Sequence, residues 1–380
     1  MMSRPVPIAD IEIGSFRSLQ GVKLNGLKPI NLLFGPNNSG KSTILEAIAL
    51  FSSPLDLRQW LDVIRSRDPG GIDEDRLISL RWCFPMEKTQ GRRPQDDGGE
   101  EFFEGDAVIR GTGTFPVREL HAHYREIEGE MEPAQIERRR RRMGIESEEP
   151  TVWLQRGAEL TVQADIEGQQ SEFARTVFWE DSFFGAPSRS QAVGLRVQWL
   201  TSSSYHSSRS LIRLVHRLRF AGYRDSALEM LRQFDPLVQD FSIGSTRGRR
   251  PTIFVLHERL GYVPLTAFGD GMRRALAIVL AAASARDGIL LLDEFEAGIH
   301  FSVLQKVLPV VFTACKHFDV EVFATTHSLE AIDAVLSIER ASLDDVAAFR
   351  LPSKTTDSVV TRYTGQALFE LRYESGMEVR

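Results

Sequence analysis

Hydrophobic and polar positions alternate in short runs near the start of the chain. Short segments with the pattern of strands, at residues 11–13, 22–24 and 30–34, are separated by glycine, asparagine and proline, which predicts strands joined by turns. The apolar residues of the next segment, 43–50, recur with helical spacing. Three short strands are therefore expected, the last of which leads into a helix.

The pattern changes twice more along the chain. Strands are expected in the middle, at residues 77–84, 107–123, 152–166, 176–179 and 193–200. Helical spacing follows between residues 207 and 234, and then a hairpin at residues 251–265. In the last third, helices alternate with strands, at residues 272–286, 289–293, 302–317 and 320–325. This alternation indicates an α/β layer with parallel strands.

A phosphate-binding pattern lies between the third strand and its helix. Residues 35–42 fit G-x-x-x-x-G-K-[ST] in the strand–loop–helix context that a P-loop needs. Lys41 would reach the β- and γ-phosphates, and the Ser42 hydroxyl would bind Mg²⁺. The residues predicted to bind the nucleotide are Asn37, Asn38, Ser39, Gly40, Lys41, Ser42 and Thr43. ATP and Mg²⁺ are the predicted ligands, although no motif distinguishes ATP from GTP.

Two acids follow the buried strand predicted at residues 289–293. Asp293 is predicted to hold Mg²⁺, and Glu294 to act as the general base that polarises the attacking water. His327 follows the next strand, so it would lie at the same sheet edge and sense the γ-phosphate. These residues extend the prediction from nucleotide binding to hydrolysis.

A glycine turn precedes the helix predicted at residues 272–286. Gly269 and Gly271 would let the helix N-terminus present to a phosphate, because helix N-termini bind anions. A plain helix start, with Thr266 and Asp270 as caps, is the alternative.

Together these motifs resemble the ATPase heads of the ABC–SMC superfamily. More closely, they are similar to the overcoming-lysogenization-defect (OLD) ATPases and their stand-alone relatives, without the Toprim nuclease pattern after His327. The resemblance implies an α/β P-loop NTPase head of ABC/SMC type, with a mixed sheet, an antiparallel β lobe and an inserted β/helical subdomain. Residues 1–84 and 240–380 would form the head, and residues 85–239 the insertion.

The resemblance also implies a homodimer in which ATP lies between one P-loop and the glycine turn of the second copy. Residues 296–300 would communicate across that dimer, and His327 would be the switch histidine. Two positions depart from the ABC pattern. Gly269 and Asp270 stand where serine and the first glycine are expected, and the metal-contacting glutamine is left open among Gln59, Gln163 and Gln198.

Composition limits the class of protein. The 380 residues are 42% hydrophobic and 26% charged with a net charge of −6, which is ordinary for a globular chain and excludes a protein that coats nucleic acid. Cys83 and Cys315 lack metal-ligand spacing, which favours a reduced, cytoplasmic setting. Apolar stretches are too short for a membrane span. Basic segments at residues 138–142, 209–219 and 247–250 leave nucleic-acid binding open.

The predicted function is an Mg²⁺-dependent ATPase that acts as a nucleotide-gated dimer. The resemblance suggests prokaryotic phage defence or genome maintenance, with a separately encoded nuclease or toxin as effector. One alternative is a mainly non-catalytic ATP sensor that restrains such a partner. The other is a RecF-like DNA repair ATPase.

Overall fold

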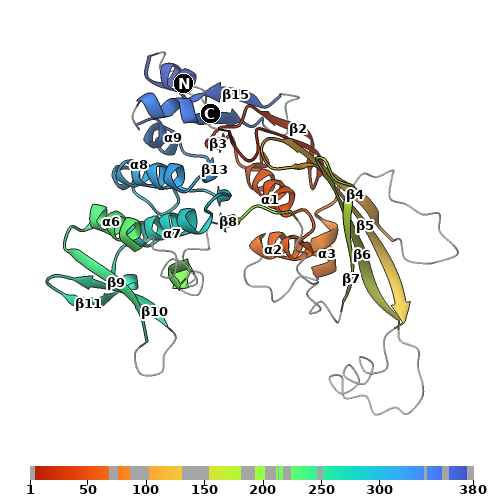
Figure 1. Ribbon diagram of the computed structural model, residues 1–380, viewed down its shortest axis with the longest axis horizontal. Helices are drawn as coiled ribbons and strands as arrows, with labels where there is room; N and C mark the ends of the chain where they lie inside the picture. Colours follow the sequence, from red (N-terminus) through yellow and green to blue (C-terminus); the bar gives the residue numbers. More distant parts are fainter. Residues whose placement is uncertain are drawn as a thin grey trace, which may run out of the picture.

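Three sheets organise the part of the chain that the computed structural model describes (Figure 1). This part comprises residues 5–67, 76–85, 102–130, 154–180, 193–201, 211–212, 214–216, 224–245, 251–337, 340–352 and 359–374. The basic segment at residues 138–142 lies outside it, as do residues 217–219 and 247–250.

The central sheet is mixed and has the order β15-β14-β3-β13-β12-β8. Its strands are β3 (Ile30–Phe34), β8 (Val197–Leu200), β12 (Ile289–Leu292), β13 (Glu321–Thr326), β14 (Val346–Arg350) and β15 (Thr361–Thr364). All neighbours are parallel except β14 and β15. β3, β12 and β13 are buried at every residue, because helices cover both faces of a parallel sheet.

The two faces of this sheet belong to two hydrophobic cores. Leu32 and Phe34 pack in the core formed with α6 (Arg224–Phe234), α7 (Asp270–Ser284), α8 (Phe301–His317) and α9 (Leu329–Leu336). Leu33, between them, points to the opposite face and packs in the core that contains α1 (Lys41–Ser52). Successive side chains of a strand point to opposite faces, so one strand fixes both layers.

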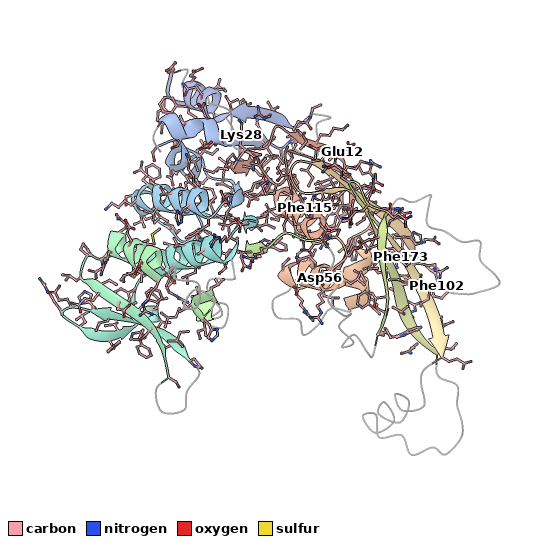
Figure 2. All side chains as sticks on the ribbon, viewed as in Figure 1. Glu12, Lys28, Asp56, Phe102, Phe115 and Phe173 are labelled. Atoms are coloured by element: carbon pink, nitrogen blue, oxygen red, sulfur yellow. The ribbon has the colours of Figure 1, made fainter. Side chains whose placement is uncertain are left out.

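An antiparallel sheet lies on the other side of α1 (Figure 1). Its order is β2-β1-β4-β5-β6-β7. The strands are β1 (Asp10–Phe16), β2 (Leu19–Asn25), β4 (Glu104–Thr112), β5 (Val117–Glu130), β6 (Leu154–Ile166) and β7 (Glu172–Trp179). Phe115, labelled in Figure 2, packs edge-on against Phe51 of α1 with ring centroids 5.9 Å apart. The P-loop helix is therefore enclosed between two sheets.

Smaller elements complete the described chain. β9 (Val238–Gly244), β10 (Thr252–His257) and β11 (Gly261–Pro264) form a third, antiparallel sheet. The remaining elements are α2 (Leu57–Arg67), α3 (Arg76–Arg81), η2 (Leu265–Ala267), η3 (Arg340–Asp345), α10 (Gly365–Phe369) and η4 (Glu370–Glu374). No helix in the described ranges is long and apolar enough to cross a membrane.

The predicted α/β class, the mixed sheet and the antiparallel β lobe are confirmed. The strand predicted at residues 77–84 is wrong, because α3 and a turn occupy this segment. Leu77, Leu80 and Cys83 are buried at a spacing of three, while Ile78 and Trp82 are exposed. This is the period of a helix, and the high content of apolar residues concealed it.

The division into a head and an insertion remains a prediction, and strand pairing crosses its boundaries. β4 lies within the predicted insertion and pairs with β1 of the predicted head. β8, also within the predicted insertion, pairs in parallel with β12 of the central sheet. Sheet formation therefore ties the middle of the chain to both ends.

Candidate functional site

The P-loop has a backbone that only glycine accommodates at two positions. Gly35 has φ 141°, and a Cβ there would lie 2.7 Å from Leu351 O. Gly40 has φ 95°, and a Cβ there would lie 2.7 Å from Leu19 Cδ2. Both values lie in the region that L side chains avoid, so the loop conformation depends on these glycines. It brings the first turn of α1 to the carboxyl end of β3.

The predicted nucleotide-binding residues lie along this loop and the first turn of α1. Asn37 and Asn38 are exposed, whereas Ser39 and Thr43 are buried. Lys41 Nζ donates hydrogen bonds to Gly35 O and Pro36 O, both at 2.8 Å.

The Lys41 ammonium group faces acids as well as these carbonyl groups. Burial lowers its pKa, and the charges of Glu294, Asp293 and Glu296 oppose that shift. The ammonium is thus a partly desolvated cation close to three acids, held in place by the loop backbone.

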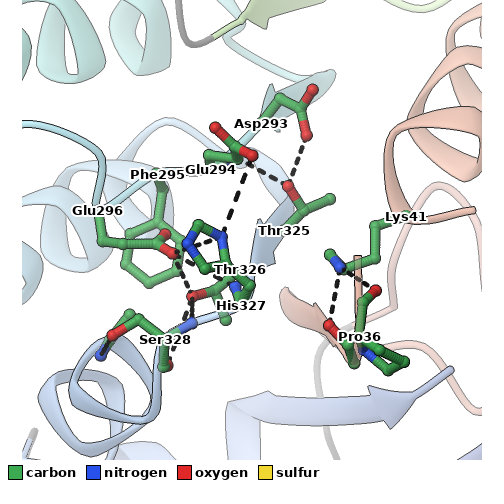
Figure 3. A network of polar contacts seen from close by, with 12 residues as sticks. Pro36, Lys41, Asp293, Glu294, Phe295, Glu296, Thr325, Thr326, His327 and Ser328 are labelled. Carbon is green, nitrogen blue, oxygen red and sulfur yellow. Dashed lines mark hydrogen bonds and ion pairs between the residues drawn. The ribbon is translucent and has the colours of Figure 1, made fainter. Parts of the chain in front are cut away.

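Asp293 connects the ends of two strands to the P-loop. Its Oδ1 accepts a hydrogen bond from Ser42 Oγ at 2.9 Å and another from Thr325 Oγ1 at 2.6 Å. Figure 3 shows the contact with Thr325. Ser42 lies in the first turn of α1, Asp293 follows β12, and Thr325 belongs to β13. A hydroxyl oxygen and a carboxylate are the hard ligands that Mg²⁺ prefers, so Ser42 and Asp293 fit this ion.

Glu294 has an unusual backbone next to this contact. Its φ is 48°, and its N–H donates a hydrogen bond to Thr325 Oγ1 at 2.8 Å. The carboxylate is 44% exposed, so water reaches it. Left-handed backbone at a residue other than glycine is strained and clusters at functional sites. In Figure 3 the carboxylates of Glu294 and Asp293 point in different directions.

His327 lies beside two carboxylates. Its Nδ1 is 3.7 Å from Glu296 Oε1 and 4.0 Å from Glu294 Oε1. Glu296 Oε1 also accepts hydrogen bonds from Thr326 Oγ1 at 2.6 Å and from His327 N at 3.3 Å. Figure 3 shows these groups on one side of the site and Lys41 on the other. The structure therefore brings together Lys41, Ser42, Asp293, Glu294 and His327, as the motifs predict.

The glycine turn is separate from this cluster. Gly269 is exposed and precedes α7, and a Cβ there would meet nothing within 4 Å. At Gly271 a Cβ would meet Phe234 Cε1 at 3.7 Å, an ordinary contact distance. Within the described chain, no hydrogen bond joins this turn to the P-loop. The packing of a single copy therefore does not require glycine at either position.

Two further residues of the site, Thr325 and Arg274, were not predicted from the sequence. Thr325 joins Asp293 to the backbone of Glu294, as described above. Arg274 is 4% exposed, and its guanidinium donates to Phe295 O at 3.0 Å, to Asp293 O at 3.2 Å and to Glu294 O. Two features of the sequence could have identified them: Arg274 interrupts the apolar pattern of a helix, and Thr325 lies at the end of a buried strand.

The three candidate glutamines are not bonded to the metal-binding pair in the described part of the chain. Gln198 lies within β8, and its amide donates to its own neighbour, Val197 O, at 3.0 Å. Gln59 belongs to α2 and Gln163 to β6 of the antiparallel sheet. β8 reaches the site by its backbone, because Asp293 N donates to Leu200 O at 2.9 Å.

Comparisons with known proteins give two family matches. A family model described as "AAA domain, putative AbiEii toxin, Type IV TA system" matches residues 133–333. A second, described as "AAA ATPase domain", matches residues 7–102. The second match contains the P-loop, and the first contains Asp293, Glu294 and His327.

Individual relatives match shorter segments. An ATP/GTP phosphatase of Helicobacter pylori is 32% identical over 113 residues, which are 29% of this chain and 30% of that protein. The DNA replication and repair protein RecF of Acinetobacter baylyi is 41% identical over 51 residues, 13% of this chain and 14% of that protein. The chain thus spans less than a third of either relative. A solved Smc head bound to the C-winged helix domain of ScpA covers 97% of this chain and 99% of its own, with a TM-score of 0.47 and 11% identity.

Proposed function

Because the chain belongs to the AAA domain family whose model matches residues 133–333, we propose that it is an Mg²⁺-dependent ATPase. One observation carries the proposal: Ser42 Oγ of the P-loop helix lies 2.9 Å from Asp293 Oδ1, and Glu294 follows in the sequence. A hydroxyl and a carboxylate for the metal, and a second carboxylate for water, are the parts that phosphoryl transfer to water requires.

Each residue of the cluster has a role in the proposed reaction. Lys41 binds the β- and γ-phosphates, and Ser42 and Asp293 hold Mg²⁺, whose charge stabilises negative charge on the phosphate oxygens. Glu294 orients the attacking water and accepts its proton. His327 donates a hydrogen bond toward the γ-phosphate while its Nδ1 faces Glu296. Thr325 and Arg274 keep the backbone of residues 293–295 in place.

Replacement of Glu294 by glutamine tests the proposal. Glu294→Gln keeps the size of the side chain and removes the base, so ATP turnover should fall by about 10²–10⁴-fold while ATP binding persists. Glu330→Gln is the matched control, because Glu330 is an exposed acid in the first turn of α9. Release of phosphate from ATP with Mg²⁺ is the measurement. Turnover that is equal in Glu294→Gln and wild type would remove the assigned base.

The same proposal includes a homodimer that completes the site. Gly269 and Gly271 would contact the γ-phosphate bound by the P-loop of a second copy. The open space around Gly269 and the merely ordinary contact distance at Gly271 support this, since a glycine that the fold itself does not need is free to meet a ligand. ATP-dependent association, measured with the slowly turning Glu294→Gln variant and lost in Gly271→Trp, is the expected result.

We place the ATPase in the cytoplasm, in phage defence or genome maintenance, with a separately encoded nuclease or toxin as effector. The description of the matching family names a toxin of a toxin–antitoxin system, which supports an effector of that kind. The narrower resemblance to OLD ATPases stays a prediction. In the alternative of a mainly non-catalytic ATP sensor, ATP binding would instead hold the partner nuclease or toxin inactive, with negligible turnover in wild type.

A RecF-like DNA repair ATPase is the second candidate function. The identical residues shared with RecF over a 51-residue segment favour it. This candidate predicts turnover that DNA stimulates and that falls steeply as salt rises, because phosphate contacts release counterions. Turnover that DNA leaves unchanged at low salt would count against it.

A further inference from the structure

A buried carboxylate lies one turn along α1 from the P-loop and is shared by two arginines. Glu46 is 1% exposed, and its Oε1 lies 2.5 Å from Arg67 Nε. Its Oε2 lies 2.6 Å from Arg17 Nε and 3.1 Å from Arg67 Nη2. Arg67 Nη2 also donates a hydrogen bond to Thr43 Oγ1 at 2.9 Å. The cluster is therefore part of the helix that begins with Lys41 and Ser42.

The charges of this cluster do not balance. Two guanidinium groups face one carboxylate, and arginine keeps its proton in proteins. The nearby thiol of Cys83 does not compensate, because burial raises its pKa to about 11 and leaves it neutral. Among the described residues, the cluster of Glu46, Arg17 and Arg67 thus carries one more positive charge than negative charge beside the P-loop. Thr43, which accepts the hydrogen bond from Arg67, is one of the predicted nucleotide-binding residues, so this charge lies beside the proposed phosphate region.

The side chains of Arg17 and Arg67 differ in how exposed they are and therefore in how easily they can move. Arg17 is 11% exposed, and its backbone N–H donates to Cys83 O at 2.9 Å in the turn between β1 and β2. Arg67 is the last residue of α2, and its side chain is 48% exposed. Arg67 is therefore the arginine that can turn toward a ligand, and Arg17 is the one that stays.

We propose that Arg67 is a further cationic ligand of the nucleotide phosphates, held ready by Glu46; this rests on the proposed function. The planar guanidinium of an arginine, with its several donors, matches phosphate oxygens as well as it matches a carboxylate. Departure of one arginine from a buried carboxylate normally leaves a costly unpaired charge. Arg17 prevents that, because it remains on Glu46 when Arg67 moves. The phosphates would thus draw Arg67 away while Glu46 stays paired to the antiparallel lobe.

Equilibrium binding of fluorescent ATP in the presence of Mg²⁺ tests the proposal. Arg67→Gln should bind about tenfold more weakly than wild type, the effect of one charge-assisted hydrogen bond. Arg65→Gln should bind like wild type, because Arg65 lies on the same helix, is 58% exposed and pairs with the exposed Asp62 at 3.5 Å. Equal affinities of Arg67→Gln and wild type would overturn the inference.

A double variant separates phosphate binding from a structural role. In Glu46→Gln/Arg67→Gln no buried carboxylate is left unpaired, and the amide oxygen of the glutamine still lies next to the Arg17 guanidinium. Binding that stays about tenfold weak supports a phosphate contact. Binding restored to the wild-type value shows that Arg67 only stabilises Glu46, and overturns the inference. This comparison also decides the matter if Arg67→Gln alone does not fold.

Lys41→Ala distinguishes the inference from the proposed function. If wild type binds ATP and Lys41→Ala does not, the P-loop site stands and the Arg67 variants test the inference alone. If wild type and Lys41→Ala bind ATP equally, the nucleotide does not occupy the P-loop, and both proposals are overturned.

Discussion

Thr325 Oγ1 donates a hydrogen bond to Asp293 Oδ1 at 2.6 Å and accepts one from Glu294 N at 2.8 Å. The buried hydroxyl of Thr325 in β13 thus fixes the position of the Asp293 carboxylate that faces Ser42, and it also holds the strained backbone of Glu294. Thr325→Val has nearly the same shape and lacks these bonds. Residues that orient metal ligands typically contribute 10–100-fold to activity, so ATP turnover should fall by about that factor.

The same substitution should lower the free energy of unfolding by about 1–3 kcal/mol, because a carboxylate and a backbone N–H lose their partner. Thr325→Ser is the control, since it keeps the hydroxyl, and should retain most of the turnover. Phosphate release and urea unfolding measure the two effects. Wild-type turnover in Thr325→Val would show that the hydroxyl does not position Asp293.

Arg274 ties α7 to the backbone of residues 293–295. Arg274→Met keeps the length of the side chain but removes the guanidinium donors to the carbonyl groups of Asp293 and Phe295. The free energy of unfolding should fall by about 2–4 kcal/mol, with a loss of turnover. Arg273→Met, next along the helix, removes an ion pair to the exposed Asp270 and should cost less than about 1 kcal/mol. Equal losses in both variants would contradict a specific role for Arg274.

A comparison of alanine substitutions at Gly40 and Gly21 separates the effect of backbone strain from that of steric overlap. Gly21 has φ 62°, and a Cβ there would meet nothing within 4 Å. Gly21→Ala should therefore cost about 1–2 kcal/mol for its left-handed backbone alone. Gly40→Ala adds the 2.7 Å approach to Leu19 Cδ2, and should cost about 1–3 kcal/mol more. Urea unfolding of the two variants gives the difference. ATP affinity should fall only in Gly40→Ala, since only Gly40 belongs to the P-loop.

Glu321 should make stability depend on pH. It is 1% exposed at the start of β13, and it accepts hydrogen bonds from Ile8 N at 3.0 Å and Asn31 Nδ2 at 3.4 Å. Burial raises its pKa well above the ordinary value of 4.5. The folded chain then keeps a proton that the unfolded chain has lost, so stability falls as pH rises from 4.5 through the raised pKa.

Glu321→Gln keeps the shape and lacks this titration. Between pH 4.5 and the raised pKa of Glu321, the stability of Glu321→Gln relative to wild type should increase by up to about 1.4 kcal/mol per pH unit. Below pH 4.5 the difference in stability should not change with pH. Glu330→Gln, an exposed acid, should track wild type at every pH. Urea midpoints measured across the window provide the comparison. A constant gap between Glu321→Gln and wild type would show that Glu321 does not titrate there.

The local motifs were predictable because each lies in one segment with its own pattern. The P-loop needs eight consecutive residues, and Asp293 and Glu294 directly follow a run of apolar residues. α3 was missed because its segment is apolar enough to resemble a strand, and only burial distinguishes the faces. Thr325 and Arg274 were missed for a different reason: their partners are in other elements.

The sequence by itself determined that a P-loop, an acidic pair and a histidine terminate strands of an α/β layer, since period and residue type are local properties of the chain. Only the tertiary structure decided that Ser42 meets Asp293, that β8 joins the central sheet, and that Glu46 is shared by Arg17 and Arg67. Ser42 and Asp293 are 251 positions apart. Contacts at such separations depend on how sheets and helices pack, and no local pattern specifies them.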